Sequence, residues 1–219
     1  MANKTATTLG QIILAIVNVP TEMFGTLLDV INKLTSKENG EFVKKLKHLL
    51  RDEVVIVLPN IIKWLGRTTT RRTTREFIAK ERFRKDSKEV KFYEIAPSFK
   101  KWFLSGNGKI EDPLDNRTLR YGNLTRNYSY WQIIEELGGK EKAETTLAEL
   151  WDQLEKQPEG ANGYLLTDGS INIFYVKDTQ GELRAVRVYW YGSGWGVHAD
   201  YVENPDGWIS GYRVFCRNS

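Results

Sequence analysis

The sequence is poor in the residues that cross-link a protein or hold a metal. Its 219 residues include one cysteine, Cys216, and two histidines, His48 and His198. One cysteine excludes an internal disulfide framework, and one cysteine with two distant histidines excludes the usual zinc clusters. The acidic segment 203–206 offers fewer oxygen ligands than calcium takes. We therefore expect no metal site, and the scarcity of cysteine favours a reducing, cytoplasmic compartment.

Motifs for catalysis are also missing. The sequence has no Gly-x-Ser-x-Gly, no phosphate-binding P-loop and no His-Glu-x-x-His. His198 has no partner at a recognisable spacing, and Cys216 alternates with Val214 in a predicted last strand, where a buried, inert thiol is expected. These absences predict a protein that is not an enzyme and needs no cofactor.

The sequence has little in the way of long apolar runs. The run from Leu9 to Val19 is too short to span a bilayer, and no Ala-x-Ala cleavage pattern follows it. We expect a buried amphipathic helix here, with export or contact with a membrane surface as the alternative.

Charge is present but unevenly placed. Residues 1–62 carry a net charge of +1, residues 63–101 a net charge of +8, and residues 102–219 a net charge of −5. The chain is thus a basic middle followed by an acidic C-terminal part. A basic stretch of this kind suggests an anionic partner or an internal contact with the acidic part.

Residues 1–66 are predicted to form a small helical bundle. Apolar residues recur at helical spacing from Met23 to Leu34 and again from Phe42 to Leu50. The apolar segment 54–65 is expected to continue the helices, with a kink or break at Pro59. If its stripes faced other copies, the bundle would make the chain a structural or assembly subunit and a homo-oligomer.

Residues 67–88 are predicted to be a basic linker rich in threonine and arginine. The run 67–75 contains no apolar residue, and the interleaved phenylalanines begin at Phe77. Such a segment could also neutralise phosphates, so the alternative function is nucleic-acid binding through 63–91. The residues that would carry it are Arg67, Arg71, Arg72, Arg75, Arg82 and Arg84.

Residues 89–219 are predicted to form an α+β domain, in which helices pack on an antiparallel β-meander. Helices are expected after Pro97-Ser98, from Ser129 to Leu137, and after a cap at Thr145 or Thr146. Turn signals separate the expected strands. These strands are 90–95, 163–167, 171–177, 183–191, 195–202 and 212–217.

The last thirty residues carry an unusual density of aromatic and small polar side chains. In the strand 195–202, Trp195, Val197 and Ala199 alternate with Gly196, His198 and Asp200, so the apolar set should face the helices. Binding loops use the same vocabulary, because rigid rings give contact area and small polar groups give hydrogen bonds. The segment therefore favours a binding protein.

This segment resembles the C-terminal end of C-type-lectin-fold variable proteins, the targets of diversity-generating retroelements. The residues that carry the resemblance are Trp190, Gly194-Trp195-x-Val-x-Ala199, Asn204-Pro205 and Gly211-Tyr212-Arg213-Val-Phe. Residues 76–219 also resemble uncharacterised proteins of small-genome uncultivated bacteria. The first resemblance implies a fixed scaffold with a variable binding face. By motif position the scaffold would be Trp190, Trp195, Val197, Ala199, Pro205, Trp208, Gly211 and Arg213.

The resemblance leads to a specific hypothesis about function. It implies a non-catalytic binding protein that presents a face rich in tyrosine and tryptophan, hypervariable as in that family, to a protein or glycan ligand. The implied ligand-contacting residues are Tyr189, Tyr191, Ser193, His198, Asp200, Tyr201, Asn204, Asp206, Ser210 and Tyr212.

Overall fold

The structure is a computed structural model that describes residues 24–36, 40, 43, 60–202 and 207–217. The chain divides into two compact units, Met1–Leu58 and Pro59–Ser219. In the first unit the structure describes helix α2 (Phe24–Thr35), which confirms the helix predicted there. The other predicted apolar helices, at 9–19 and 42–50, lie outside the described residues except for Val43. Within the described ranges, no helix combines the length and apolar character needed to cross a membrane.

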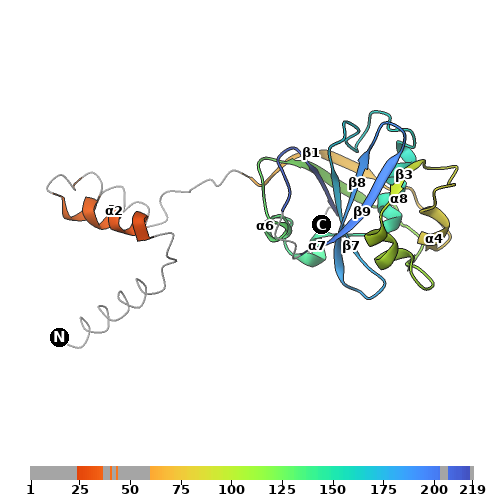
Figure 1. Cartoon of the computed structure of the whole chain (residues 1–219), viewed down its shortest axis with the longest axis horizontal. Helices are drawn as coiled ribbons and strands as arrows, with labels where there is room; N and C mark the ends of the chain where they lie inside the picture. Colours follow the sequence, from red (N-terminus) through yellow and green to blue (C-terminus); the bar gives the residue numbers. More distant parts are fainter. Residues whose placement is uncertain (1–23, 37–39, 41–42, 44–59, 203–206, 218–219) are drawn as a thin grey trace. The chain divides into compact units, whose positions relative to one another are not determined.

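The second unit is built on an eight-stranded mixed sheet (Figure 1). The strands follow the order β1-β5-β10-β7-β8-β9-β3, and β6 pairs with β7 outside this path. Their bounds are β1 Ile62–Thr69, β3 Phe92–Ile95, β5 Thr118–Leu124, β6 Glu144–Thr145, β7 Asn172–Lys177, β8 Leu183–Trp190, β9 Trp195–Tyr201 and β10 Arg213–Arg217.

The expectation of an antiparallel meander is correct only for part of this sheet. Strands β7, β8 and β9 pair antiparallel through the short turns that the sequence marks with glycine. By contrast, β3 lies parallel to β9, and both β6 and β10 lie parallel to β7. Parallel neighbours need long connections, and turn signals between adjacent strands cannot reveal such pairings.

The predicted boundaries at 66 and 88 are wrong in the structure. The helical expectation fails at residues 62–66, because these belong to β1, which pairs with β5. The predicted linker is part of the fold: Thr70 N donates to Arg117 O at 2.8 Å, and Thr73 N donates to Leu114 O at 2.7 Å. These partners lie more than forty residues away in sequence, so the local composition of the segment, which is typical of a solvated linker, could not reveal them.

The predicted helices of the second unit are confirmed at the positions of their capping residues. Helix α6 (Tyr130–Glu136) begins with a capping box between Ser129 and Gln132, and α8 (Leu147–Lys156) with one between Thr146 and Glu149. The helix after Pro97 is also present. The remaining elements are β2 Phe77–Ile78, α4 Ala79–Arg82, α5 Pro97–Phe99, the π-helical turn η2 Lys100–Leu104, β4 Ile110–Glu111 and α7 Lys140–Ala143.

One predicted strand, 163–167, is absent. These residues form bends that are held by the buried side chain of Gln157, which accepts from Leu165 N at 2.8 Å and donates to Leu165 O at 3.1 Å. The Gln157 side chain thus satisfies the backbone hydrogen bonds of Leu165 that a neighbouring strand would otherwise satisfy.

Two apolar clusters occupy the two faces of the sheet. One face packs against α4, α5, η2 and α8 and buries Trp195, Val197 and Ala199, which confirms the predicted alternation of β9. The other face packs against α6 and α7 and buries Trp208. Cys216 lies in this second cluster, and burial raises the pKa of its thiol to about 11, as expected for an inert cysteine.

Candidate functional site

Among the described residues, one end of the sheet extends beyond the apolar cluster on the side of α6 and α7. The apolar cluster on that side includes Leu183 and Ala185 of β8 but no residue of β9 itself. Beyond it, β8 presents Arg187 and Tyr189 on the same side as His198 and Asp200 of β9, because Arg187 pairs with His198 and Tyr189 with Gly196. Glu94 of β3 also pairs with Gly196. We call the surface formed by Glu94, Arg187, Tyr189, His198 and Asp200 the uncovered face.

A triangle of polar atoms lies at the centre of the uncovered face. His198 Nε2 is 3.0 Å from Tyr189 Oη and 3.0 Å from Glu94 Oε2, and the Tyr189 hydroxyl donates to Glu94 Oε2 at 3.1 Å. Gly196 makes this possible, since a Cβ there would lie 2.4 Å from Tyr189 Cζ. His198 therefore has partners that its sequence surroundings did not suggest.

The hydrogen bonds of the triangle change the pKa values of Glu94 and Tyr189. The hydrogen bond from His198 lowers the pKa of Glu94, and burial together with the hydrogen bond to Glu94 raises the pKa of Tyr189. A lowered carboxyl pKa stabilises the fold above the ordinary value near 4.5, and this contribution disappears as pH falls through the lowered pKa.

Replacing His198 by alanine should therefore raise the pKa of Glu94 towards its ordinary value. The reason is that the largest interaction holding the carboxylate ionised is the bond from His198. The measurement is a titration of the Glu94 carboxyl carbon by NMR in the full chain and in His198→Ala. An unchanged titration midpoint would show that the triangle does not exist in solution.

An ion pair borders a shallow hollow beside the triangle. Arg187 Nε lies 3.0 Å from Asp200 Oδ2, yet neither atom makes a well-aligned hydrogen bond within the described residues. Both side chains line a hollow of about 290 Å³ whose other walls include Trp208, Ile209 and Tyr212. The hollow thus combines an apolar wall with a charged pair.

Two exposed tyrosines stand at the edge of the uncovered face. Tyr93 of β3 and Tyr191 of the β8–β9 turn have ring centroids 4.6 Å apart and are 44% and 59% exposed. Lys85 Nζ lies 5.9 Å from the Tyr93 ring and also donates to the Tyr93 carbonyl. Paired rings in contact with solvent offer a ready contact surface for a partner.

The structure brings some of the predicted ligand-contacting residues together and separates others. Tyr189, His198 and Asp200 share the uncovered face, Tyr191 and Ser193 lie in the adjoining turn, and Tyr212 borders the hollow. Ser210 is exposed, but its side chain and amide are bonded to Thr125 and Asn127. Asn204 and Asp206 lie outside the described residues.

Tyr201 points to the opposite side of the sheet. Its ring packs against Trp102 at 4.9 Å, and the Arg184 guanidinium lies 4.7 Å from it. Arg184 in turn is paired with buried Asp178 at 2.8 Å. Tyr201 therefore covers a structural ion pair and does not join the uncovered face.

Three residues of the site were not predicted from the sequence. Glu94 and Tyr93 reach it through the parallel pairing of β3 with β9, which joins segments about a hundred residues apart. Arg187 had a local signal, because it alternates with Tyr189 along β8.

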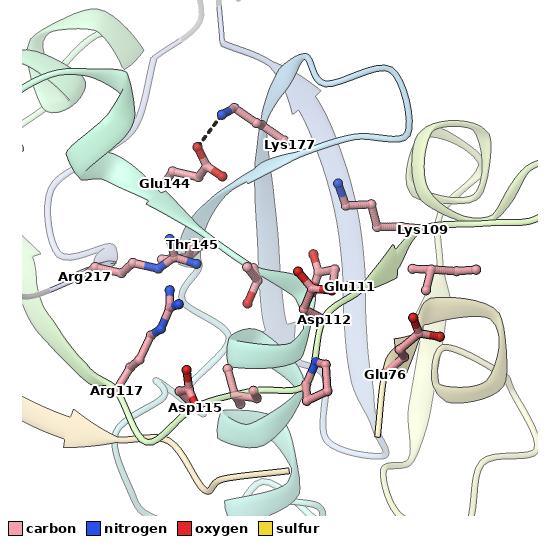
Figure 2. Close-up of a pocket in the computed structure, with 14 residues that line it drawn as sticks. Glu76, Lys109, Glu111, Asp112, Asp115, Arg117, Glu144, Thr145, Lys177 and Arg217 are labelled. Carbon is pink, nitrogen blue, oxygen red and sulfur yellow. Dashed lines mark ion pairs between the residues drawn. The ribbon is translucent and has the colours of Figure 1, made fainter. Parts of the chain in front are cut away.

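The hollow drawn in Figure 2 is larger, about 490 Å³, and part of its charge is paired within the fold. Lys177 pairs with Glu144 at 2.7 Å, and Arg217 pairs with Glu149 at 3.0 Å. Glu111 accepts from the backbone of Leu147 and Ala148 and so occupies the N-terminus of α8. Burial raises the pKa of Glu111 despite these bonds. We do not assign the binding site to this hollow.

The structure also divides the arginines that were predicted to bind nucleic acid between different places. Arg71, Arg72, Arg75 and Arg82 line one hollow of about 400 Å³. Arg67 is exposed on β1, and Arg84 lies 3.7 Å from Asp86 in an exposed ion pair. In the described ranges, no cluster of three His, Cys, Asp or Glu could hold a metal ion.

Comparison of the chain with known proteins identifies no relative: no family model, curated protein or solved structure matches it. The fold that the structure shows is a mixed β-sheet with helices packed on it, which belongs to the α+β class.

Proposed function

We propose that the chain is a non-catalytic binding protein whose uncovered face, together with Tyr93 and Tyr191, contacts a protein or glycan ligand. The observation that carries this proposal is the arrangement of exposed rings and polar groups at the end of the sheet that, among the described residues, extends beyond the apolar cluster on the side of α6 and α7. Tyr93 and Tyr191 supply ring surface, and Glu94, His198 and Asp200 supply hydrogen-bonding groups beside them.

Burial along the last strands supports the proposal. Among the described residues, each implied ligand-contacting position is exposed or half-buried. Of the implied scaffold residues, Trp195, Val197, Ala199 and Trp208 are buried, whereas Trp190 and Arg213 are half-buried and Gly211 is exposed. A binding face that varies over a constant core requires this separation, since a buried position cannot change freely without loss of packing.

The ligand can be sought with probes of both classes. The full chain would be applied to an array of defined glycans and to a random-peptide phage library, alongside the variant Tyr93→Ala/Tyr191→Ala. Ligands retained by the natural chain and lost by the variant would support the proposal. Identical retention profiles, or no ligand from either class, would count against it.

The proposed variability of the face has its own test in DNA. We expect the parent genome to encode a reverse transcriptase and a near-copy of the codons for residues 186–217. Mismatches between the two copies should fall at adenines and change positions such as Tyr189, Tyr191 and His198. If no such copy exists, the face is constant and the relation to retroelement targets is refuted.

A further inference from the structure

The basic segment, which the proposed function does not use, forms a second candidate site. Residues 68–71 are bonded to Gln153, Lys156 and Asp152 on the side of α8, and the backbone of 70–73 is bonded to residues 114–117. Two hollows border this segment, of about 400 Å³ and about 430 Å³. Both are lined by Arg71 and Arg72, so they adjoin one another along the segment.

The charges around the two hollows differ in how far they are neutralised. Arg71 Nε lies 2.8 Å from Asp152 Oδ1 and its guanidinium also contacts Glu155, while Lys156 Nζ lies 2.7 Å from Asp152 Oδ2. These contacts leave the acidic side chains of α8 paired. Arg72 and Arg75 are exposed and make no ion pair within the described part of the chain.

Arg82 adds a third cation to the first hollow. It reaches Glu89 at 3.8 Å in a solvent-exposed pair, which is a weak interaction. Its guanidinium lies 5.9 Å from the Trp151 ring. Arg72, Arg75 and Arg82 are therefore the least neutralised cations of the first hollow, whose lining also includes the exposed acidic residue Glu76.

Apolar and aromatic groups lie beside these cations. The first hollow has walls of Phe77, Leu114, Ala148 and Trp151. The second is bordered by Asn116 and by Tyr164, which is 39% exposed. A chain that carries an anionic backbone and flat bases could place phosphates on the arginines and a base against Tyr164.

We propose that the two hollows along residues 68–77 bind single-stranded nucleic acid. Arg72, Arg75 and Arg82 neutralise phosphates, and Tyr164 stacks on a base. The arrangement favours a single strand over a duplex because the aromatic group must reach an unpaired base. It favours nucleic acid over an acidic peptide because the apolar walls and the exposed ring match bases, which recur beside each phosphate.

The test is fluorescence anisotropy of the full chain with a labelled oligothymidylate at several salt concentrations. Three neutralised phosphates predict that log Kd changes with log salt with a slope of about 2, since each phosphate on a single strand contributes about 0.7. Arg72→Gln/Arg75→Gln should reduce the slope to about 0.7 and weaken low-salt binding at least tenfold. Tyr164→Ala should weaken binding at least fivefold with little change in slope.

The matched control is Lys63→Gln/Lys100→Gln, which removes the same charge from exposed positions outside both hollows. This control and the variant Tyr93→Ala/Tyr191→Ala should bind oligothymidylate as the natural chain does, so this proposal can fail independently of the proposed function. Undetectable binding at low salt would overturn it. So would equal weakening by the lysine control, or equal affinity for a duplex or for polyglutamate of the same length.

Discussion

Replacing Arg217 by alanine should lower the free energy of unfolding by about 3–5 kcal/mol, the typical cost of removing one partner of a buried ion pair. The Glu149 side chain is fully buried, and its two oxygens lie 3.0 and 3.3 Å from Arg217 Nε. Without Arg217 the carboxylate would remain buried close to Glu111, which is also acidic. In a protein of this size the melting temperature should fall by on the order of 10 °C.

A control for this prediction lies in the same hollow (Figure 2). Lys177 pairs with Glu144, but the two side chains are 48% and 22% exposed, so Lys177→Ala should cost no more than about 1 kcal/mol. The double variant Arg217→Ala/Glu149→Gln should recover a large part of the lost stability, because the amide can still cap α8. Equal melting temperatures for Arg217→Ala and Lys177→Ala would contradict the claim that the buried pair Arg217–Glu149 stabilises the fold.

Replacing Tyr93 and Tyr191 together by alanine should weaken ligand binding at least about 30-fold. The few aromatic residues that dominate an interface contribute about 2 kcal/mol or more each, and 1.4 kcal/mol corresponds to a factor of ten. Because both residues are exposed at the surface, the free energy of unfolding should change by less than about 1 kcal/mol. The measurements are Kd by calorimetry and a denaturant titration on the same samples.

Trp131→Ala provides the comparison for this variant. Trp131 is also an exposed aromatic residue, 42% exposed, and lies on α6 outside the uncovered face. Its removal should leave Kd unchanged. If Trp131→Ala weakened binding as much as the tyrosine pair, the ligand would be contacting aromatic residues without selecting the uncovered face.

Elements specified by local signals could be predicted from the sequence. Helices α6 and α8 begin where Ser129 and Thr146 cap them, and β7, β8 and β9 follow apolar runs bounded by turn residues. Elements that depend on distant partners could not be predicted. The local pattern predicts helix for the first residues of β1 and linker for residues 67–69, because the pairing of β1 with β5 joins residues about 50 to 60 positions apart.

The same distinction applies to the candidate site. Alternation along β9 placed His198 and Asp200 together opposite the buried Trp195. The same alternation puts Tyr201 on the side of Trp195, so its separation from the face could have been foreseen. Glu94 could not have been found this way, since it meets His198 only through the parallel pairing of β3 with β9.

The location of a bound ligand is the most direct test of the central claim that the uncovered face is the binding surface. Hydrogen–deuterium exchange of the full chain would be compared with and without a peptide or glycan selected in the screen. We predict slower exchange in β3 and in the hairpin 183–201, with exchange along 68–77 unchanged. Slower exchange along 68–77, with no change in the hairpin, would contradict the account.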